Sequence, residues 1–388
     1  MHSNIYNRLE QRLSKRWQQG ILRQLPANKA SSIDFSSNDY LGFNQEKVNT
    51  FSPVARGATG SRLLTGNSEA ATKLEEKLAQ LFKSESALLF NSGFSVNSGI
   101  FQAICGAEDC IILDTQAHAS LKDGAKLSSA SVFYFRHNDT AHLEQRLQKL
   151  SQRAQNSPYD DQTGILFVAV ESVYSMDGDI APLEELLHLC KRYQAHLIID
   201  EAHAFGVLGE WGEGLVSAKG LEDKVFARIL TFGKAIGYHG AVVLGKKILI
   251  QTLINFCNSF IYTTALPLDH LAAIDHNISH LFADRMALLQ LRNNISYACK
   301  AFRLENKTHA TPIFSLVFKD IVALKEASQA LAQHNINVFP IFSPTVKRGT
   351  ERLRVIIHAH NTPQEIDLLR KVLKPYEQFW QENFHYRH

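Results

Sequence analysis

The sequence predicts an α/β fold with a mostly parallel central sheet covered by helices. Short, continuously apolar segments, such as residues 111–113 and 197–199, alternate with longer segments in which apolar residues recur at helical spacing. Strands that are apolar throughout are buried on both faces, as happens when helices cover a parallel sheet. Several apolar segments also end directly in a polar residue, which is typical of parallel strands whose carboxyl ends line a binding crevice.

Length and composition exclude several classes of protein. The chain has 388 residues, 45% of them hydrophobic and 20% charged, with 41 Lys and Arg against 38 Asp and Glu. That balance is too apolar for a disordered protein, and a formal net charge of +3 provides no broad positive field for nucleic acid. The 5 cysteines are scattered without a C-x-x-C pair, which argues against a disulfide framework or a zinc site. Since single cores stop growing at roughly 250–300 residues, the length predicts two domains.

The first predicted element is an amphipathic, basic helix over residues 5–17. Ile5, Leu9 and Leu13 recur there at helical spacing. Two interpretations stay open: a helix docked on the body of the protein, or a lid or surface for an anionic substrate. The segment lacks an apolar signal-peptide core, and no run approaches the roughly 18 apolar residues of a membrane span. We therefore expect a cytoplasmic protein with no membrane partner.

Helices and strands alternate from about residue 68. Residues 68–82 form a helix with Leu74, Leu78 and Leu81 on one face, and further helices are predicted at 140–150 and 183–193. The predicted strands comprise residues 87–90, 111–113, 132–135, 165–170, 197–199, 225–232 and 241–244. The polar residues 151–163 indicate a surface insertion.

The pattern changes after about residue 285 and predicts a smaller α+β domain. Its expected strands comprise residues 312–318, 337–342 and 352–357, and its expected helices comprise 321–333 and 363–379. We therefore predict a large domain over 46–285 and a small C-terminal domain over 286–388. The N-terminal segment 1–45 is expected to pack with the small domain.

Four polar residues follow predicted strands directly and are candidates for a site: Asp114, Glu171, Asp200 and Lys234. Asp200 opens the sequence Asp-Glu-Ala-His, which ends at His203. Metal binding by this pair lacks further ligands nearby in sequence, and a helix cap by Asp200 is a structural alternative. The third interpretation is a carboxylate that balances positive charge on a bound heteroaromatic ring.

Lys234 follows a buried strand and is flanked by Gly233 and Gly237, which allow close backbone approach. Most lysines are solvated, but one partly desolvated in a crevice can act as a Schiff-base nucleophile. His118 follows a strand and opens a helix, as a structural residue or as a ring stacked on a planar ligand. The turn ending at Gly93 leaves helix N–H groups available for a phosphate.

Together these features meet the requirements of pyridoxal 5′-phosphate (PLP): an anion cradle, a stacking ring, a carboxylate for the ring nitrogen, and a lysine. No resident metal is expected.

Five ordered motifs extend this interpretation, and the chain from about residue 30 to 375 resembles the α-oxoamine synthases, which are fold-type I PLP enzymes. The motifs are Phe-Ser-Ser-Asn-Asp-Tyr-Leu-Gly at 35–42, Gly-Ser-Arg-Leu-Leu-Thr-Gly-Asn at 60–67, Ser-Met-Asp-Gly-Asp at 175–179, Asp-Glu-Ala-His at 200–203, and Thr-Phe-Gly-Lys at 231–234. Members of this family condense an amino acid with an acyl thioester and release CO2.

The resemblance implies roles for five residues around the cofactor ring. Lys234 matches the Schiff-base lysine and proton shuttle, and Asp200 matches the partner of the pyridinium nitrogen. His203 matches the donor to the ring 3-oxygen, and His118 matches the imidazole stacked on the ring. Ser175 matches the serine beside the cofactor.

The resemblance also implies how the phosphate is held. Gly93 and Phe94 match the backbone cradle, and Thr231 matches the hydroxyl on the phosphate. Thr263 and Thr264 fall where the second subunit of the family's dimer reaches the phosphate, without a choice between them. An obligate homodimer with shared active sites is therefore expected.

The substrate side rests on Arg354, which matches the arginine for the amino-acid carboxylate, and on Asn38, which matches an asparagine near the substrate. Arg23 is assigned to the acyl chain. Within the family, the motifs most resemble members that join L-alanine to a pimeloyl thioester of CoA or acyl carrier protein; members using glycine or serine are the alternative. The chain departs from the family at Ala71, where a histidine is usual, and at Phe205, a bulkier residue expected at the pocket edge.

Overall fold

The computed structural model describes residues 5–19, 22, 25, 32–45, 57–155, 164–303 and 311–381. The chain divides into two compact units. The larger unit takes its described residues from 38–313 and 357–360, and the smaller unit takes them from 1–37, 314–356 and 361–388. The second boundary therefore lies at residue 313 rather than 285. Helix α11 (Met286–Ala301) belongs to the larger unit, where Asn294 Nδ2 donates to the carbonyl oxygens of His358 and Ala359 at 2.9 and 3.1 Å.

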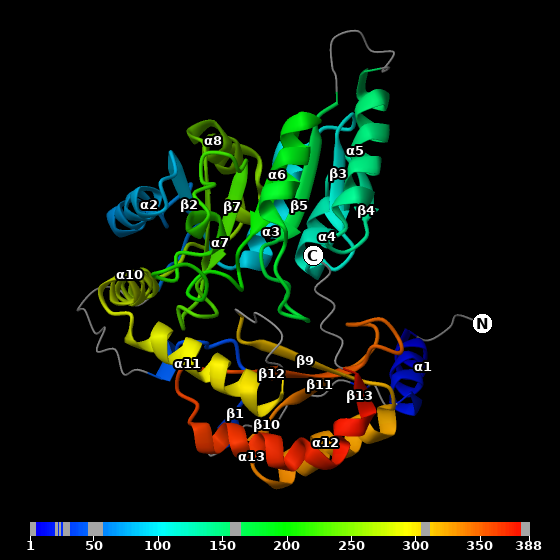
Figure 1. The fold of residues 1–388 in the computed structure, drawn as a ribbon. Helices are drawn as coiled ribbons and strands as arrows, with labels where there is room; N and C mark the ends of the chain where they lie inside the picture. The colour runs from blue at the N-terminus through cyan, green and yellow to red at the C-terminus, as the bar shows by residue number, and fades with distance from the viewer. Residues whose placement is uncertain are drawn as a thin grey trace. The chain divides into compact units, whose positions relative to one another are not determined.

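A seven-stranded sheet forms the centre of the larger unit, in the order β2-β8-β7-β6-β5-β3-β4 (Figure 1). Its strands are β2 (Ser86–Phe90), β3 (Cys110–Asp114), β4 (Ser131–Phe135), β5 (Leu166–Glu171), β6 (Ala195–Asp200), β7 (Ala227–Thr231) and β8 (Ala241–Gly245). Strands β3 to β7 pair in parallel, and only β8 runs antiparallel, to β2 and β7. The predicted α/β class and mostly parallel sheet are confirmed.

Helices cover both faces of this sheet. The helices described in the larger unit are α2 (Glu69–Leu81), α3 (Gly93–Ile104), α4 (Ala119–Leu127), α5 (Thr140–Gln155), α6 (Leu183–Arg192), α7 (Leu215–Ala218), α8 (Lys247–Phe256), α9 (Asn258–Ile261), α10 (Leu268–Ala283) and α11. Figure 1 shows α6 in front of the strands and α3 behind them. Ile111 packs in a core cluster with α3 side chains, while its neighbour Ile112, also fully buried, lies outside that cluster because successive strand residues face opposite sides.

The predicted insertion at 151–163 begins inside a helix, because α5 continues through Gln155; residues 156–163 lie outside the described part of the chain. The parallel register places the carboxyl ends of β5 and β6 side by side, with Glu171 paired to Asp200. The sheet thus brings the predicted site residues of different strands to one edge.

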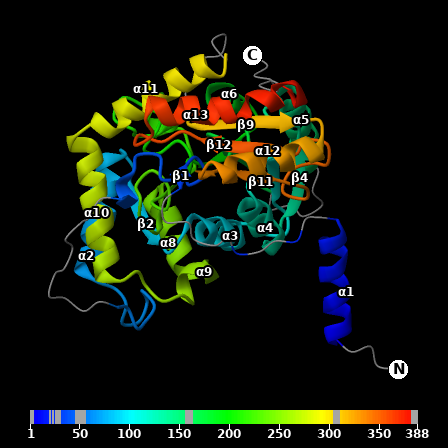
Figure 2. The ribbon, with the colours of Figure 1, turned by 90° about the horizontal axis from the view of Figure 1, so that it is seen from below.

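The smaller unit contains a four-stranded sheet, β11-β12-β9-β13, and a separate parallel pair, β1-β10. The strands are β1 (Ile33–Asp34), β9 (Ile313–Phe318), β10 (Ile336–Asn337), β11 (Phe339–Ile341), β12 (Arg352–Ile356) and β13 (Trp380–Gln381). Helices α12 (Ile321–Gln333) and α13 (Pro363–Leu373) lie along one face of the four-stranded sheet (Figures 1 and 2). The pairing of Ile33 with Ile336 joins the N-terminal segment to this unit.

Two predicted elements of this unit are wrong in detail. The helix expected at 363–379 stops at Leu373 and continues as the 3-10 helix η2 (Lys374–Phe379), because Pro375 cannot supply the N–H that an α-helix needs. The strand expected at 337–342 is divided between β10 and β11. In β11, Pro340 lies on an edge strand, where a missing donor is tolerated.

Helix α1 (Ile5–Gln18) forms as predicted, but none of its residues is buried. Its apolar residues Ile5, Leu9 and Leu13 are 47%, 42% and 56% exposed. The interpretation of a helix docked on the body therefore finds no support in the part of the chain that the structure describes. Helix η1 (Phe43–Gln45) belongs to the larger unit. No helix of the described residues is both long and apolar enough to cross a membrane.

Candidate active site

The carboxyl-terminal edge of the large sheet brings together the lysine, histidine and aspartate that the sequence predicts. Asp200 is the last residue of β6, and its exposed fraction is 5%. His203 follows in the next turn and is 3% exposed. Lys234 comes just after β7, and its Nζ lies 2.6 Å from Nε2 of His203. These three side chains come from loops at the ends of neighbouring strands, as the strand-end rule predicts.

Gly237, three residues after Lys234, has a φ of 67° and contacts that both exclude a side chain. A Cβ there would lie 2.4 Å from the backbone nitrogen of Asn44. The predicted close backbone approach near Lys234 is therefore confirmed at Gly237.

Both oxygens of Asp200 accept hydrogen bonds. Oδ1 accepts from the backbone N–H of Ala202 at 2.9 Å, and Oδ2 accepts from Nδ2 of Asn97 at 2.7 Å. Asp200 and His203 belong to no group of three or more candidate metal ligands among the described residues. Two donors thus fix the position of this carboxylate, which suits a partner for a cationic ring nitrogen.

Asn97 also connects Asp200 to His118. The same Nδ2 lies 2.9 Å from Oγ of Ser120, which lies 2.7 Å from Nδ1 of His118. The backbone N–H of Ser120 donates to the same Nδ1 at 3.2 Å. Nδ1 is therefore an acceptor, which assigns the ring proton of a neutral His118 to Nε2.

The charge state of His118 follows from its surroundings. Burial lowers the pKa of His118, although the negative charge of Asp200 opposes this effect; Lys234 and Lys122 lower it further. We therefore describe His118 as a neutral imidazole near pH 7, as expected for a ring that stacks on an aromatic ligand. No local pattern predicted the role of Ser120, and the one available indication for Asn97 was its place one helical turn after Gly93.

The predicted anion cradle lies at the start of α3. Ser92 caps this helix, and its Oγ accepts from the N–H of Ser95 at 3.1 Å. The first N–H groups of a helix have no partner within the helix, and here they include those of Gly93 and Phe94. A Cβ on Gly93 would lie 3.7 Å from Cβ of Thr231, so the predicted phosphate residues are neighbours.

The threonines predicted for the phosphate already have partners. Thr231 Oγ1 donates to the carbonyl of Gly240 at 3.1 Å. Asn91 Nδ2 donates to Oγ1 of Thr263 at 3.1 Å and to the carbonyl of Thr264 at 2.9 Å. Thr263 thus points its hydroxyl at Asn91, just before the cradle in the same chain. Contact with a second subunit stays a prediction for both residues.

His203 has a second partner that the sequence did not assign. Its Nδ1 lies 2.5 Å from the hydroxyl of Tyr40, and that hydroxyl lies 3.2 Å from Oδ1 of Asn38. Asn38, predicted near the substrate, is therefore connected through Tyr40 and His203 to Lys234. The sequence feature that could have indicated Tyr40 is its place in the motif at 35–42.

Glu171 is a further acid at this edge, paired in register with Asp200 and 2% exposed. Burial, reinforced by the charge of Asp200, raises the pKa of Glu171 to about 8, although Lys234 opposes this effect. Glu171 is therefore mostly protonated at pH 7.

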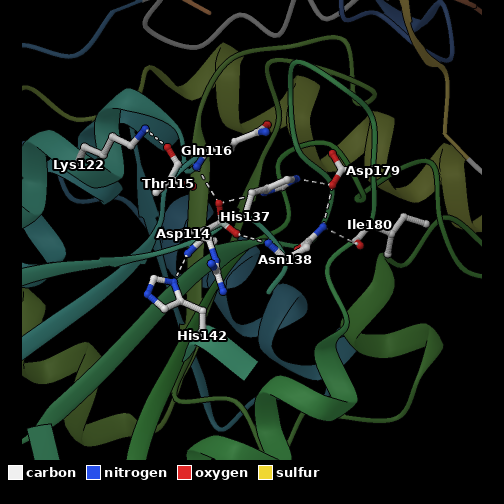
Figure 3. Close-up of polar contacts among 10 residues, drawn as sticks. Asp114, Thr115, Gln116, Lys122, His137, Asn138, His142, Asp179 and Ile180 are labelled. Carbon is white, nitrogen blue, oxygen red and sulfur yellow. Dashed lines mark hydrogen bonds and ion pairs between the residues drawn. The ribbon is translucent and has the colours of Figure 1, made fainter. Parts of the chain in front are cut away.

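A charged cluster forms around His137 and includes Asp179 (Figure 3). His137 lies between two carboxylates, with Nδ1 3.0 Å from Asp114 Oδ1 and Nε2 2.6 Å from Asp179 Oδ2. Asn138 contacts the same two acids, through its N–H at 2.9 Å and its Nδ2 at 2.7 Å. Ser175 is half-buried in the turn that precedes Asp179. The cluster ties this turn to the end of β3.

The charge of His137 follows from that geometry. Burial alone would lower the pKa of His137, but hydrogen bonds to Asp114 and Asp179 outweigh burial and raise it to about 10. His137 is thus an imidazolium at neutral pH, which neutralises one of two nearby carboxylates.

The remaining predicted residues are distributed as follows. Arg354 is half-buried on β12 of the smaller unit, while its neighbour Arg352 is buried and donates to Ser315 Oγ at 3.2 Å. Arg23 lies outside the described residues.

The two departures from the family pattern are both core residues. Phe205, expected at the pocket edge, is 1% exposed and packs edge-on against Phe82, with ring centroids 5.4 Å apart. Ala71 is 2% exposed on α2. Phe205 thus fills the core of the larger unit, because its backbone turns inward after His203.

Comparison with known proteins identifies the family to which this chain belongs. The family model described as aminotransferase class I and II matches residues 30–373. The chain is 35% identical over 365 residues to an 8-amino-7-oxononanoate synthase from Saccharophagus degradans, covering 91% of this chain and 89% of that protein. A relative of the same name from Emericella nidulans is 36% identical over 405 residues and covers 94% of each chain.

Comparison with solved structures shows the same fold over most of the chain. Serine palmitoyltransferase from S. paucimobilis superimposes with a TM-score of 0.84 at 25% identity, covering 96% of this chain and 97% of that chain. The 8-amino-7-oxononanoate synthase from Francisella tularensis superimposes with a TM-score of 0.74 at 26% identity, covering 90% of this chain and 98% of that one.

Proposed function

The chain belongs to the class I and II aminotransferase family and is a PLP enzyme, and we propose that it acts as an 8-amino-7-oxononanoate synthase. The observation that carries this proposal is the connected arrangement of Asp200, His203 and Lys234 at one sheet edge, with Lys234 Nζ 2.6 Å from His203 Nε2. The relatives of that name, at 35% and 36% identity over most of the chain, support the choice within the family.

The residues present fit the cofactor. Gly93 and Phe94 offer N–H groups for the phosphate at the start of α3, a helix end that favours anions. Asn97 and Ala202 hold the Asp200 carboxylate in place, as a partner for the ring nitrogen requires. Oδ1 of Asn97 is buried without a partner among the described residues, which leaves polar capacity inside the site.

In the proposed reaction, L-alanine condenses with a pimeloyl thioester of CoA or acyl carrier protein. The products are 8-amino-7-oxononanoate, CO2 and the free thiol carrier. When bound, PLP supplies an electron sink for the carbanion at the alanine Cα. Asp200 balances the positive charge of the ring nitrogen, and His203 donates to the ring oxygen.

The other proposed roles concern the substrate. Arg354 binds the alanine carboxylate, and Lys234 Nζ removes the proton from Cα. The electron pair on Cα attacks the thioester carbonyl and expels the thiolate. The carboxylate then leaves as CO2, and Lys234 returns a proton to Cα.

A second candidate, a synthase that uses glycine or serine, is favoured by the similarity to serine palmitoyltransferase. The two candidates share every cofactor residue, so substrate choice alone separates them. We also propose that the protein works as a homodimer in the cytoplasm, with Thr263 or Thr264 contributing to the partner's phosphate site.

The test supplies the purified PLP-loaded protein with pimeloyl-CoA and with L-alanine, glycine or L-serine in turn, and identifies products by mass spectrometry. We expect 8-amino-7-oxononanoate from L-alanine, with CO2 release and free CoA. Lys234→Ala should abolish that product. A product formed only from glycine or serine would replace the proposed function with the second candidate.

A further inference from the structure

A buried chain of side chains leads away from Lys234. Lys234 Nζ lies 2.6 Å from Nε2 of His203, and the Tyr40 hydroxyl lies 2.5 Å from Nδ1 on the other side of the ring. Tyr40 is fully buried and His203 is 3% exposed. The hydroxyl of Tyr40 lies a further 3.2 Å from Oδ1 of Asn38. His203 therefore joins a lysine to a phenol at short range.

With a charged lysine and a neutral imidazole, this geometry determines where the hydrogens lie. A charged lysine only donates, so Nε2 of a neutral His203 must accept from it, and the ring proton lies on Nδ1. Nδ1–H then donates to the oxygen of Tyr40. The phenol hydrogen is left to donate to Asn38, so that all hydrogen bonds in the chain run in one direction.

The proposed role of His203 toward the cofactor requires the opposite direction. To donate from Nε2 to the ring oxygen, a neutral His203 must accept a hydrogen bond at Nδ1. A phenol can do so by turning its hydrogen from Asn38 to His203, because a tyrosine hydroxyl both donates and accepts. A carboxylate in that place would only accept, and an ammonium would only donate.

We propose that Tyr40 is a positioning residue that holds His203 in either tautomer and so lets it face first Lys234 and then the cofactor ring. This inference rests on the PLP cofactor and not on the proposed substrates.

Packing alone does not account for the hydroxyl. The Tyr40 and His203 rings are 6.1 Å apart and tilted by 49°, so they are not stacked. Phenylalanine would fill the same volume, whereas a buried hydroxyl is unfavourable unless it is hydrogen-bonded. Tyr40→Phe therefore removes the proposed function of the residue and keeps its packing.

The experiment follows the visible absorbance of the PLP-loaded enzyme across pH, without substrate. Tyr40→Phe should shift the midpoint of the absorbance change by about 0.5–1 pH unit, the size of one neutral hydrogen bond. The affinity of the apoenzyme for PLP, measured by titration, should fall about 3–10-fold. Tyr193→Phe is the matched control, since that phenol bonds Glu144 at 3.3 Å away from the site, and it should change neither quantity.

A double variant separates positioning from a general loss of structure. In a His203→Ala background, Tyr40→Phe should shift the midpoint no further, because the two residues act as one unit. A Tyr40→Phe enzyme that titrates like wild type would overturn the inference, and so would the same shift in the His203→Ala background. A failed product assay would overturn the proposed substrates and leave this result standing, whereas a protein that takes up no PLP would overturn both.

Discussion

Nδ2 of Asn97 lies 2.7 Å from Oδ2 of Asp200, and the two residues are 1% and 5% exposed. The other contact of this amide nitrogen is Ser120 Oγ, which leads to Nδ1 of His118. One asparagine thus holds the carboxylate for the ring nitrogen and, through a serine, the imidazole expected on the face of the ring. Asn97 and Ser120 are not themselves assigned a contact with the cofactor, so both act by positioning Asp200 and His118.

Asn97→Ala should weaken PLP binding about 10-fold or more, because a hydrogen bond to a charged group contributes about 1.5–3 kcal/mol. Titration of the apoenzyme with PLP measures the loss. Asn294→Ala is the matched control: Asn294 is also buried, but it donates to the carbonyls of His358 and Ala359. The control should lower thermal stability without a comparable loss of affinity. Equal affinity losses would contradict the positioning role.

The stability contributed by His137 should depend on pH. Its pKa is raised to about 10 in the folded protein, against 6.5 for an unperturbed histidine. A raised histidine pKa stabilises the fold fully below about pH 6.5, and that contribution disappears as pH rises to about 10. His137→Gln should therefore lower the melting temperature strongly at pH 6 and only slightly at pH 10.

The control for this experiment is His334→Gln, which changes an exposed histidine at the end of α12. It should give a nearly constant difference from wild type across the same range. A His137→Gln difference that does not shrink as pH rises would show that His137 is not charged in the folded protein.

Glu171 should produce a different pH effect, because its pKa is raised to about 8 by burial and by Asp200. An acid with a raised folded pKa makes the fold progressively less stable as pH rises from about 4.5 to 8. Glu171→Gln keeps the shape without that ionisation. The melting temperature of the variant, relative to wild type, should thus be higher at pH 8 than at pH 5, whereas the exposed control Glu185→Gln should show no such trend. A trend of the opposite sign would refute the protonated Glu171.

Arg228 should be needed for stability rather than for chemistry. Its guanidinium pairs with Glu201, with side chains 4% and 0% exposed, and it also donates to Ser217 Oγ at 2.8 Å. Arg228→Ala should cost about 3–5 kcal/mol in urea unfolding, because it leaves the Glu201 carboxylate buried without its counter-charge. Arg136→Ala removes an exposed pair with Asp139 and should cost at most about 1 kcal/mol. Similar costs for the two variants would contradict the importance of burial.

Arg354→Ala should raise the KM for L-alanine about 10–100-fold, since the proposed contact with the substrate carboxylate is charge-assisted. Uptake of PLP should stay near the wild-type level. Arg348→Ala, an exposed arginine in the turn before β12, serves as the control and should leave KM unchanged. An unchanged KM in Arg354→Ala would show that another residue binds the alanine carboxylate.

Local sequence was sufficient for much of the fold and for the main site residues. Asp200 and Lys234 were found because each follows an apolar strand, and the parallel pairing of β6 and β7 brings those strand ends together. Element boundaries were less predictable. The end of α13 at Leu373 depends on Pro375, while α11 joins the larger unit through contacts with residues 357–360 that periodicity does not reveal.

Supporting residues were beyond prediction, because their partners are distant in sequence. Asn97 and Asp200 are separated by 103 residues, and Tyr40 and His203 by 163. In each pair, the local sequence around one residue does not indicate its partner. His137 likewise contacts Asp114 and Asp179 only because folding brings β3, β4 and the turn after β5 together.

By itself, the sequence determined the fold class, the sheet edge that carries the site, and the lysine, aspartate and histidines expected around PLP. It could do so because strand periodicity and strand ends are local properties of the chain. Only the tertiary structure decided which side chains hold those residues, that burial raises the pKa of Glu171, and that Phe205 belongs to the core. Those outcomes depend on burial and on hydrogen-bond geometry between segments far apart in sequence, which exist only in the folded chain.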